Sequence, residues 1–216
     1  MSLPIPTLRR SHTRYDELGL GEIVKRLTRG RIAGDHLCHE DPMFADGYCA
    51  FGQTGAAQSH LARRGVGPGD VFLFFGLFAA ENGDELQHRI FGYLKVDRVI
   101  LLGAAPPSWH ESRFPRQHPH TIGEWNANNT LYVGAGTTSQ RSPDALRLTT
   151  QGGPLSTWHV PPWLREVGLT YHLRSERWLA DDRLKAVARG QEFVADIQNH
   201  ERAQDWLQGV MRAIEE

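Results

Sequence analysis

The sequence predicts an α+β fold, in which a curved, mostly antiparallel sheet is flanked by a few helices. Apolar runs typical of strands gather in the middle of the chain, and residues 71–75 and 90–96 are the clearest of them. Apolar residues at helical spacing occur in shorter segments, near the two ends of the chain and after residue 54. Strands grouped between helices in this way are typical of α+β proteins.

Three helices are expected. In residues 16–30 four apolar residues recur at helical spacing, and Gly30 stands where a left-handed C-terminal cap is favoured. The small residues of segment 54–64 predict a second helix with Thr54 as its N-cap. Residues 201–214 close the chain as a third helix, with its apolar residues on one side.

The strands follow from two kinds of pattern. The continuous apolar run VFLFF at residues 71–75 predicts a buried strand that starts from the turn GPGD. Residues 90–96 alternate between two faces, and we expect residues 98–102 to extend the sheet. Further strands are expected at TLYVG (130–134), LRLT (146–149) and GLTYHL (168–173).

Residues 103–129 are rich in Pro, His, Trp and Asn. Because this segment carries Trp109, Phe114 and Trp125, we expect a long ordered loop and not a flexible linker. Such loops are often functional. The tryptophans could stack on a base, but loop tryptophans more often fix a loop to the core.

Length and charge limit the possibilities. The 216 residues suffice for one domain, and we expect a single α+β domain over residues 1–216. Charge is nearly balanced, with 24 basic and 25 acidic side chains, so no overall positive field indicates nucleic acid. The excess of basic residues in segment 1–34 is interpreted as a solvated helix face.

The two cysteines, Cys38 and Cys49, form neither a C-x-x-C pair nor a disulfide framework, which predicts free thiols in an intracellular protein. The sequence has no apolar run of about 18 residues and no signal-peptide core. We therefore expect a cytoplasmic protein that does not bind a membrane.

The segment GDHLCHEDP, residues 34–42, concentrates two histidines, a cysteine and three carboxylates. His36 and His39 would share a face on a helix, but Gly34 and Pro42 argue against a helix. On a loop their spacing constrains little. We therefore expect a polar loop that lines a site through hydrogen bonds, with no metal and no cofactor.

A second histidine cluster, His118-Pro-His120, could supply further ligands. In an extended segment the two imidazoles point to opposite sides, so we expect only one of them to reach a shared ion. The alternative is that these histidines bond loop carbonyls or line a polar pocket.

Catalytic signatures such as G-x-x-x-x-G-K-[ST], H-E-x-x-H and G-x-S-x-G are absent from the sequence. The segment GAGTTS, residues 134–139, could present backbone N–H groups to a phosphate, but no helix pattern follows it. We interpret this segment as a simple turn.

Two resemblances add to this reading. The turn GPGD before an apolar strand, followed by IFGYLKV, resembles the central strands of the PUA-like superfamily (PUA, ASCH, EVE and YTH domains). That resemblance implies a small open barrel as an alternative form of the sheet, and a pocket that holds a base of RNA or DNA.

A second resemblance covers nearly the whole chain. The segments HEDP, FGQTGAAQSHL, GVGPGDVFLFFG, FGYLKV, HPH, NNTLYV, LTYH with RW, and GQEFV, in this order, resemble the nucleotide modification associated domain 3 family. The link of that family to nucleotide or DNA modification, in bacteria and phages, comes from genomic association and names no reaction.

The family pattern places a leading strand and a Gly-Phe-Asp-containing loop before SLPIP, whereas this sequence starts at Met1-Ser2. The resemblance therefore implies that the chain is N-terminally short. A sheet edge would then be uncovered, and a homodimer is a possible way to cover it.

The resemblance singles out candidate ligand-binding residues because they fall inside its motifs: His39, Asp41, Gln53, Gln58, His118, His120 and Asn129. An amide side chain can bond the polar edge of a base, which suits the glutamines and the asparagine. Small helix residues packed on the sheet explain the Gln53 to Gln58 region equally well.

Three functions remain open, and no catalytic residue is assigned. The first is a binding module that holds a nucleotide or a base of nucleic acid in a PUA-like pocket. The second is an enzyme of nucleotide modification with a His/Asp site, with or without a metal. The third is a scaffold for protein partners. We expect the first, because the sequence offers a sheet architecture and no ordered catalytic set.

Overall fold

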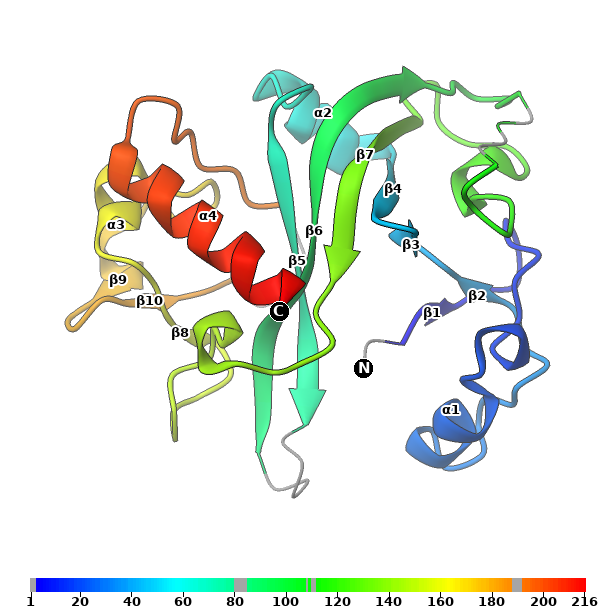
Figure 1. The fold of residues 1–216 in the computed structure, drawn as a ribbon, viewed down its shortest axis with the longest axis horizontal. Coiled ribbons are helices and arrows are strands. Elements are labelled where there is room, and N and C mark those ends of the chain that lie inside the picture. Colours follow the sequence, from blue (N-terminus) through cyan, green and yellow to red (C-terminus); the bar gives the residue numbers. More distant parts are fainter. Residues whose placement is uncertain (1–2, 80–84, 108, 110–111, 188–191) are drawn as a thin grey trace. The chain divides into compact units, whose positions relative to one another are not determined.

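The computed structural model describes residues 3–79, 85–107, 109, 112–187 and 192–216 (Figure 1). The chain divides into two compact units. Unit 1 comprises Met1–Phe72 and Leu94–Thr137, and unit 2 comprises Leu73–Tyr93 and Thr138–Glu216. Strands β5 (Val71–Ala79) and β6 (Leu86–Leu101) contribute residues to both units.

The fold is α+β, as the sequence predicts. The largest sheet has the strand order β3-β4-β7-β6-β5, which leaves two edges, so it is not a closed barrel within the described residues. Its other strands are β3 (Met43–Ala45), β4 (Tyr48–Gln53) and β7 (Thr130–Thr138). The pairs β3/β4 and β4/β7 are antiparallel, as are the strand pairs of the two smaller sheets.

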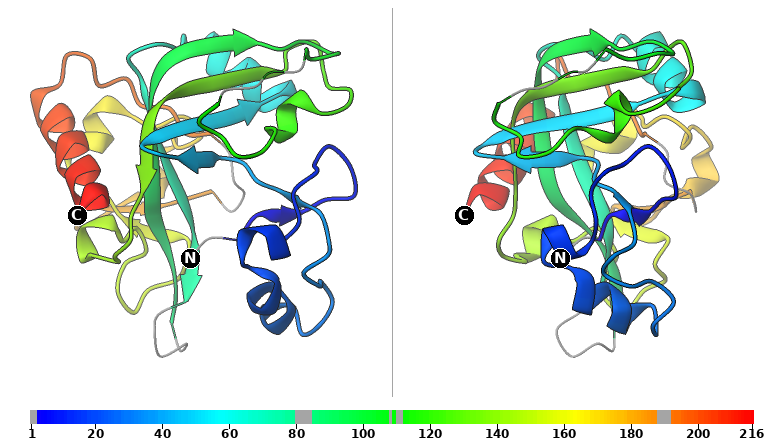
Figure 2. Two further views of the ribbon diagram at one scale, coloured as in Figure 1. Left: turned by 45° about the vertical axis from the view of Figure 1, so that its right-hand side comes forward. Right: turned by 90° about the vertical axis from the view of Figure 1, so that its right-hand side faces the viewer.

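The N-terminal part of unit 1 folds over a small core of its own. Strand β1 (Ile5–Pro6) pairs with β2 (Cys38–His39), and Ile5 lies opposite His39. The N-terminal segment is drawn in dark blue in Figure 2. A 3₁₀-helix η1 (Asp16–Leu18) and helix α1 (Gly21–Leu27) complete this part. The apolar residues buried in this core are Tyr15, Leu20, Val24 and Cys38.

The hairpin of β3 and β4 leads into helix α2 (Gly55–Arg63). The turn is Asp46-Gly47, and both residues have positive φ, as a two-residue hairpin turn requires. Helix α2 starts after Thr54, as predicted, but Asn128 caps it: the Gly55 N–H donates to Asn128 Oδ1 at 2.8 Å.

Unit 2 has a second, aromatic core. It is built on the three-stranded sheet β8-β10-β9, formed by Thr157–His159, Arg183–Lys185 and Trp178–Leu179. Trp158 and Leu184 are buried there. Helices α3 (Trp163–Val167) and α4 (Glu201–Glu215) and the 3₁₀-helices η3 (Asp144–Leu146) and η4 (Ser175–Arg177) complete this unit. The expected C-terminal helix is confirmed by α4.

The expected helix at residues 16–30 divides into η1 and α1, and Gly30 has the expected positive φ of 78°. The segment 134–138 continues strand β7, so the turn expected there is wrong. The strand expected at residues 71–75 forms, but it is only partly buried, and Phe74 is its one buried residue.

Two other expected strands do not form. Residues 146–149 make isolated bridges at Arg147 and Thr149. Residues 168–173 turn instead of extending, because Tyr171 has a φ of 66°. Leu148 and Leu169 of these segments pack in the core of unit 2, whereas Tyr171 and Leu173 are exposed.

Both cysteines are buried free thiols, as expected. Among the described helices, none is long and apolar enough to span a bilayer.

Candidate functional site

The candidate site is built around Asp41, which follows β2 in unit 1. Its side chain is 6% exposed, and its carboxylate accepts hydrogen bonds from the backbone N–H of Gly52, at 3.1 and 3.3 Å. The Asp41 N–H donates to the carbonyl of His39 at 3.0 Å, which closes a tight turn centred on Glu40. Glu40 instead forms a two-point ion pair with Arg116, at 2.9 and 3.0 Å.

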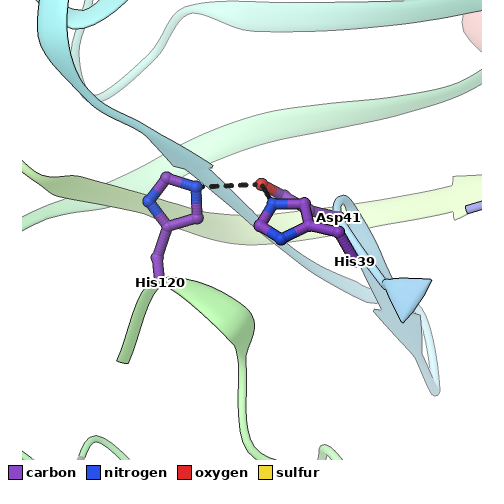
Figure 3. Close-up of side chains that lie close together, drawn as sticks. All are labelled: His39, Asp41 and His120. Carbon is purple, nitrogen blue, oxygen red and sulfur yellow. Dashed lines mark ion pairs between the residues drawn. The ribbon is translucent and has the colours of Figure 1, made fainter. Parts of the chain in front are cut away.

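Three imidazoles face this carboxylate, and together the four residues are called the Asp41 cluster: His39, Asp41, His118 and His120. The Nε2 atoms of His39 and His120 lie 3.6 and 3.4 Å from Asp41 Oδ2. Figure 3 shows them reaching this carboxylate from separate segments. The Nε2 of His118 lies 3.4 Å from Oδ1. His39 is the most exposed of the cluster, at 24%, so the cluster opens to solvent on that side.

Both histidines of the HPH segment face Asp41, so they do not point to opposite sides as an extended segment would place them. Only His120 belongs, with His39 and Asp41, to the group whose ligand atoms are close enough to share an ion. The segment is not extended: Pro119–Thr121 forms the 3₁₀-helix η2, with proline at its first position. The Nδ1 of His118 caps this helix by accepting the N–H of His120 at 3.2 Å. Within one tight helical turn the two side chains do not alternate as they would in a strand.

Asn129 fixes the orientation of the His120 ring. Its amide Nδ2 donates to the carbonyl of His120 at 2.9 Å, and this identifies the other amide atom as the acceptor. That oxygen lies 2.6 Å from Nδ1 of His120. Nδ1 therefore carries the hydrogen in the neutral ring, and the lone pair of Nε2 points toward Asp41.

Packing holds the His120 ring from two further sides. Trp125 stacks on it, with ring centroids 4.1 Å apart, and the Arg10 guanidinium lies 4.3 Å from the Trp125 ring. Below the ring is Gly52, where an added Cβ would lie 2.3 Å from Cγ and Cδ2 of His120. A glycine at this position of β4 is therefore required by the close approach of the ring.

The environment shifts the ionisation of the cluster. Burial would raise the pKa of Asp41, but the imidazoles of His118, His39 and His120 outweigh it and hold the pKa well below its usual value. Burial lowers the pKa of His120 to about 4, although Asp41 and Asn129 act in the opposite direction. Near neutral pH the cluster thus contains an ionised carboxylate next to a neutral His120.

The structure brings together five of the seven residues that the sequence singled out: His39, Asp41, His118, His120 and Asn129. The other two lie elsewhere in unit 1. Gln58 is buried in α2 and accepts a hydrogen bond from the Tyr132 hydroxyl at 3.0 Å. Gln53 ends β4 opposite Thr130.

The sequence reasoning missed Gly52 and the Glu40–Arg116 pair. The signal for Gly52 was present, since a glycine inside a strand pattern indicates that another group approaches closely. Nothing in the sequence pairs Glu40 with Arg116, because the two residues are far apart in the chain and meet only through the fold.

The ligand atoms of His39, Asp41 and His120 all lie within 4.8 Å of one another, close enough to hold one metal ion. This group of two imidazoles and one carboxylate was found among the described residues. Its members come from the motifs HEDP and HPH, which are separated by more than 70 residues in the sequence.

A family model described as nucleotide modification associated domain 3 (Nmad3) matches residues 1–196. The chain belongs to this family. The Nmad3 match includes the whole Asp41 cluster and ends before helix α4. It associates the chain with nucleotide modification. No curated protein and no solved structure matches the chain, and the PUA-like resemblance of the central strands stays a prediction.

Proposed function

We propose that this Nmad3 chain is an enzyme of nucleotide modification, and that the Asp41 cluster is its reaction centre. The observation that supports this is a buried carboxylate faced by three imidazole nitrogens at 3.4 to 3.6 Å. Imidazole and carboxylate groups in contact are the side chains that most enzymes use to move protons or hold a reacting group.

The energetics of burial favour a functional role over a structural one. An ionised carboxylate loses several kcal/mol of hydration when it is buried, and partners must offset this loss. The Gly52 N–H donates to the Asp41 carboxylate, and the imidazoles of His118, His39 and His120 supply further stabilisation that holds its pKa low. Buried charges with shifted pKa values are concentrated at functional sites.

The alternative, a pocket in which a base stacks on aromatic rings, has less support. Trp125 already stacks on His120, and the Arg10 guanidinium lies over its ring. Trp109 packs against Phe114 and His118, and Trp158 belongs to the core of unit 2. An open pocket of about 340 Å³ in unit 1 is lined by side chains that include no Phe, Tyr or Trp: His12, Thr13, Glu17, Arg116 and Gln117.

The chemistry supports an acid–base or ligand role at the open side of the cluster. His39 is the member that solvent, and therefore substrate, can reach. His118 and His120 are buried behind it. We infer that the substrate contacts His39 first, and that Asp41, His118 and His120 hold the geometry of the reacting groups.

The test expresses the chain in a bacterial host, which supplies nucleotides and co-substrates. Nucleosides from its DNA, RNA and nucleotide pool are then measured by mass spectrometry. We expect a nucleoside of altered mass with the wild-type chain and with the control Asp35→Asn, an exposed carboxylate six positions from Asp41. Asp41→Asn should abolish it.

His39→Ala provides a second variant, because a half-buried side chain can be removed with less risk to folding. It should also abolish the altered nucleoside, while circular dichroism shows a folded protein. The proposal fails if no nucleoside changes mass, or if both variants make the altered nucleoside as well as the wild type does.

A further inference from the structure

We propose that the Asp41 cluster is the binding site of a divalent first-row transition-metal ion, with His39 Nε2, His120 Nε2 and Asp41 Oδ2 as its protein ligands. The role of the ion in catalysis rests on the proposed function. The site itself is argued from the positions of these atoms.

The distances fit one shared ion. Both Nε2 atoms face the same carboxylate oxygen, at 3.6 and 3.4 Å, and all three ligand atoms lie within 4.8 Å of one another. Ligands about 2.0–2.2 Å from a tetrahedral zinc ion are separated by roughly 3.4 Å. The three atoms therefore need little movement to coordinate one ion.

The hydrogen bond to Asn129 gives a second argument. With its hydrogen on Nδ1, His120 presents a lone pair to Asp41 Oδ2 at 3.4 Å. Two electron-rich atoms that face each other in a buried site repel each other unless a cation lies between them. A metal-binding histidine whose other nitrogen donates to a fixed acceptor is a common arrangement, because the acceptor orients the ring.

The third argument is the Nε2 of His118. This ring is wholly buried, its Nδ1 accepts the His120 N–H, and its Nε2 makes no hydrogen bond in the described part of the chain. Nε2 therefore carries a hydrogen and is aimed at Asp41 Oδ1, 3.4 Å away. If Oδ2 binds the ion, Oδ1 can still accept hydrogen bonds from His118 Nε2 and the Gly52 N–H. These two donors would hold the carboxylate in the orientation that the ion needs.

The ligand set indicates the class of metal. Two imidazoles and one carboxylate suit zinc, manganese, iron(II) or cobalt, whereas calcium and magnesium prefer oxygen ligands. Three protein ligands leave a coordination position for water or substrate, as in catalytic sites and unlike closed structural sites. The exposed side of His39 is where such a position would meet solvent.

The experiment uses the full chain, stripped with a chelator and titrated with Co²⁺. We expect one ion per chain by calorimetry and a visible absorption band from the bound ion. His39→Ala should abolish the band. Its matched control is His36→Ala, because His36 also lies beside an aspartate, 3.4 Å from Asp35, but at the surface. This control should bind as the wild type does.

Asn129→Ala tests the orienting role, since Asn129 would touch the ring and not the ion. Loss of such a partner should weaken Co²⁺ binding about 10–100-fold while the absorption band keeps its shape. The proposal is overturned if the wild-type chain takes up no stoichiometric Co²⁺, or if His39→Ala binds it unchanged. Metal binding is measured here without any nucleotide, so it is independent of the test of the proposed function. If the chain produces an altered nucleoside but binds no metal, the metal site is disproved and the proposed function stands.

Discussion

Both units of the chain bury histidines, but the buried rings have different partners in the two units. In unit 2, His172 is fully buried, its Nδ1 donates to the Thr170 carbonyl at 2.9 Å, and its Nε2 accepts the Val187 N–H at 3.2 Å. In unit 1, the buried His118 and His120 face a carboxylate. Burial of a histidine is therefore not what marks a site. What distinguishes the site is a ring nitrogen that faces a carboxylate oxygen instead of a backbone group.

The largest expected difference between the two units is the stabilisation of the chain by added metal. If unit 1 holds the ion, Co²⁺ or Zn²⁺ at a thousandfold excess over its Kd should stabilise the wild-type chain by about 4 kcal/mol. Thermal melting with and without metal measures the effect. His172→Phe should keep the full gain, whereas a gain that persists in His39→Ala would place the ion elsewhere.

A pair of glycines tests the packing in the two units. Gly52→Ala puts a methyl group 2.3 Å from His120, so it should destabilise the chain by about 1–3 kcal/mol and weaken Co²⁺ binding. Gly209 lies in α4 with nothing within 4 Å of an added Cβ, so Gly209→Ala should stabilise by about 0.5–1 kcal/mol. Urea unfolding measures both. Equal effects would mean that His120 does not lie against Gly52.

His172→Phe tests the structural histidine directly. The change leaves the Val187 N–H and the Thr170 carbonyl without their partner, which should destabilise the chain by about 1–2 kcal/mol. Co²⁺ affinity and the altered nucleoside should not change. A loss of metal binding in this variant would contradict the assignment of His172 to structure.

The smallest effect concerns acid. Burial lowers the pKa of His172 from 6.5, so below pH 6.5 the unfolded chain takes up a proton that the folded chain does not. Stability is therefore lost as pH falls from 6.5 to the lowered pKa, by up to about 1.4 kcal/mol per pH unit. The free energy of unfolding of the metal-free chain, measured in urea at several pH values, should fall less steeply with decreasing pH in His172→Phe than in the wild type. Parallel slopes would refute the assignment.

The parts of the fold that the sequence predicted are those with long local patterns. Helices α2 and α4 and strand β6 each extend over enough residues for periodicity to be clear. The sheet of unit 2 was missed because its strands have two or three residues and gain stability from partners far away in sequence.

The sequence predicted which residues form the candidate site, but not how their side chains are arranged. The motifs HEDP and HPH named the residues, yet the three-residue turn at Glu40 and the short helix at Pro119 decide where their side chains point. Both depend on hydrogen bonds that form only in the folded chain. Gln58 also falls inside a family motif, but the fold places it away from the candidate site. Its side chain accepts a hydrogen bond from the Tyr132 hydroxyl.

The pairing of Ile5 with His39 has a practical consequence for anyone who purifies this protein. Strand β1 pairs with the backbone of His39, the most exposed imidazole of the Asp41 cluster, so an affinity tag at the N-terminus would be attached only a few residues before a strand that contacts the candidate site. The last residue, Glu216, is exposed and lies beyond the Nmad3 match. A cleavable tag at that end avoids adding foreign histidines beside the native ones.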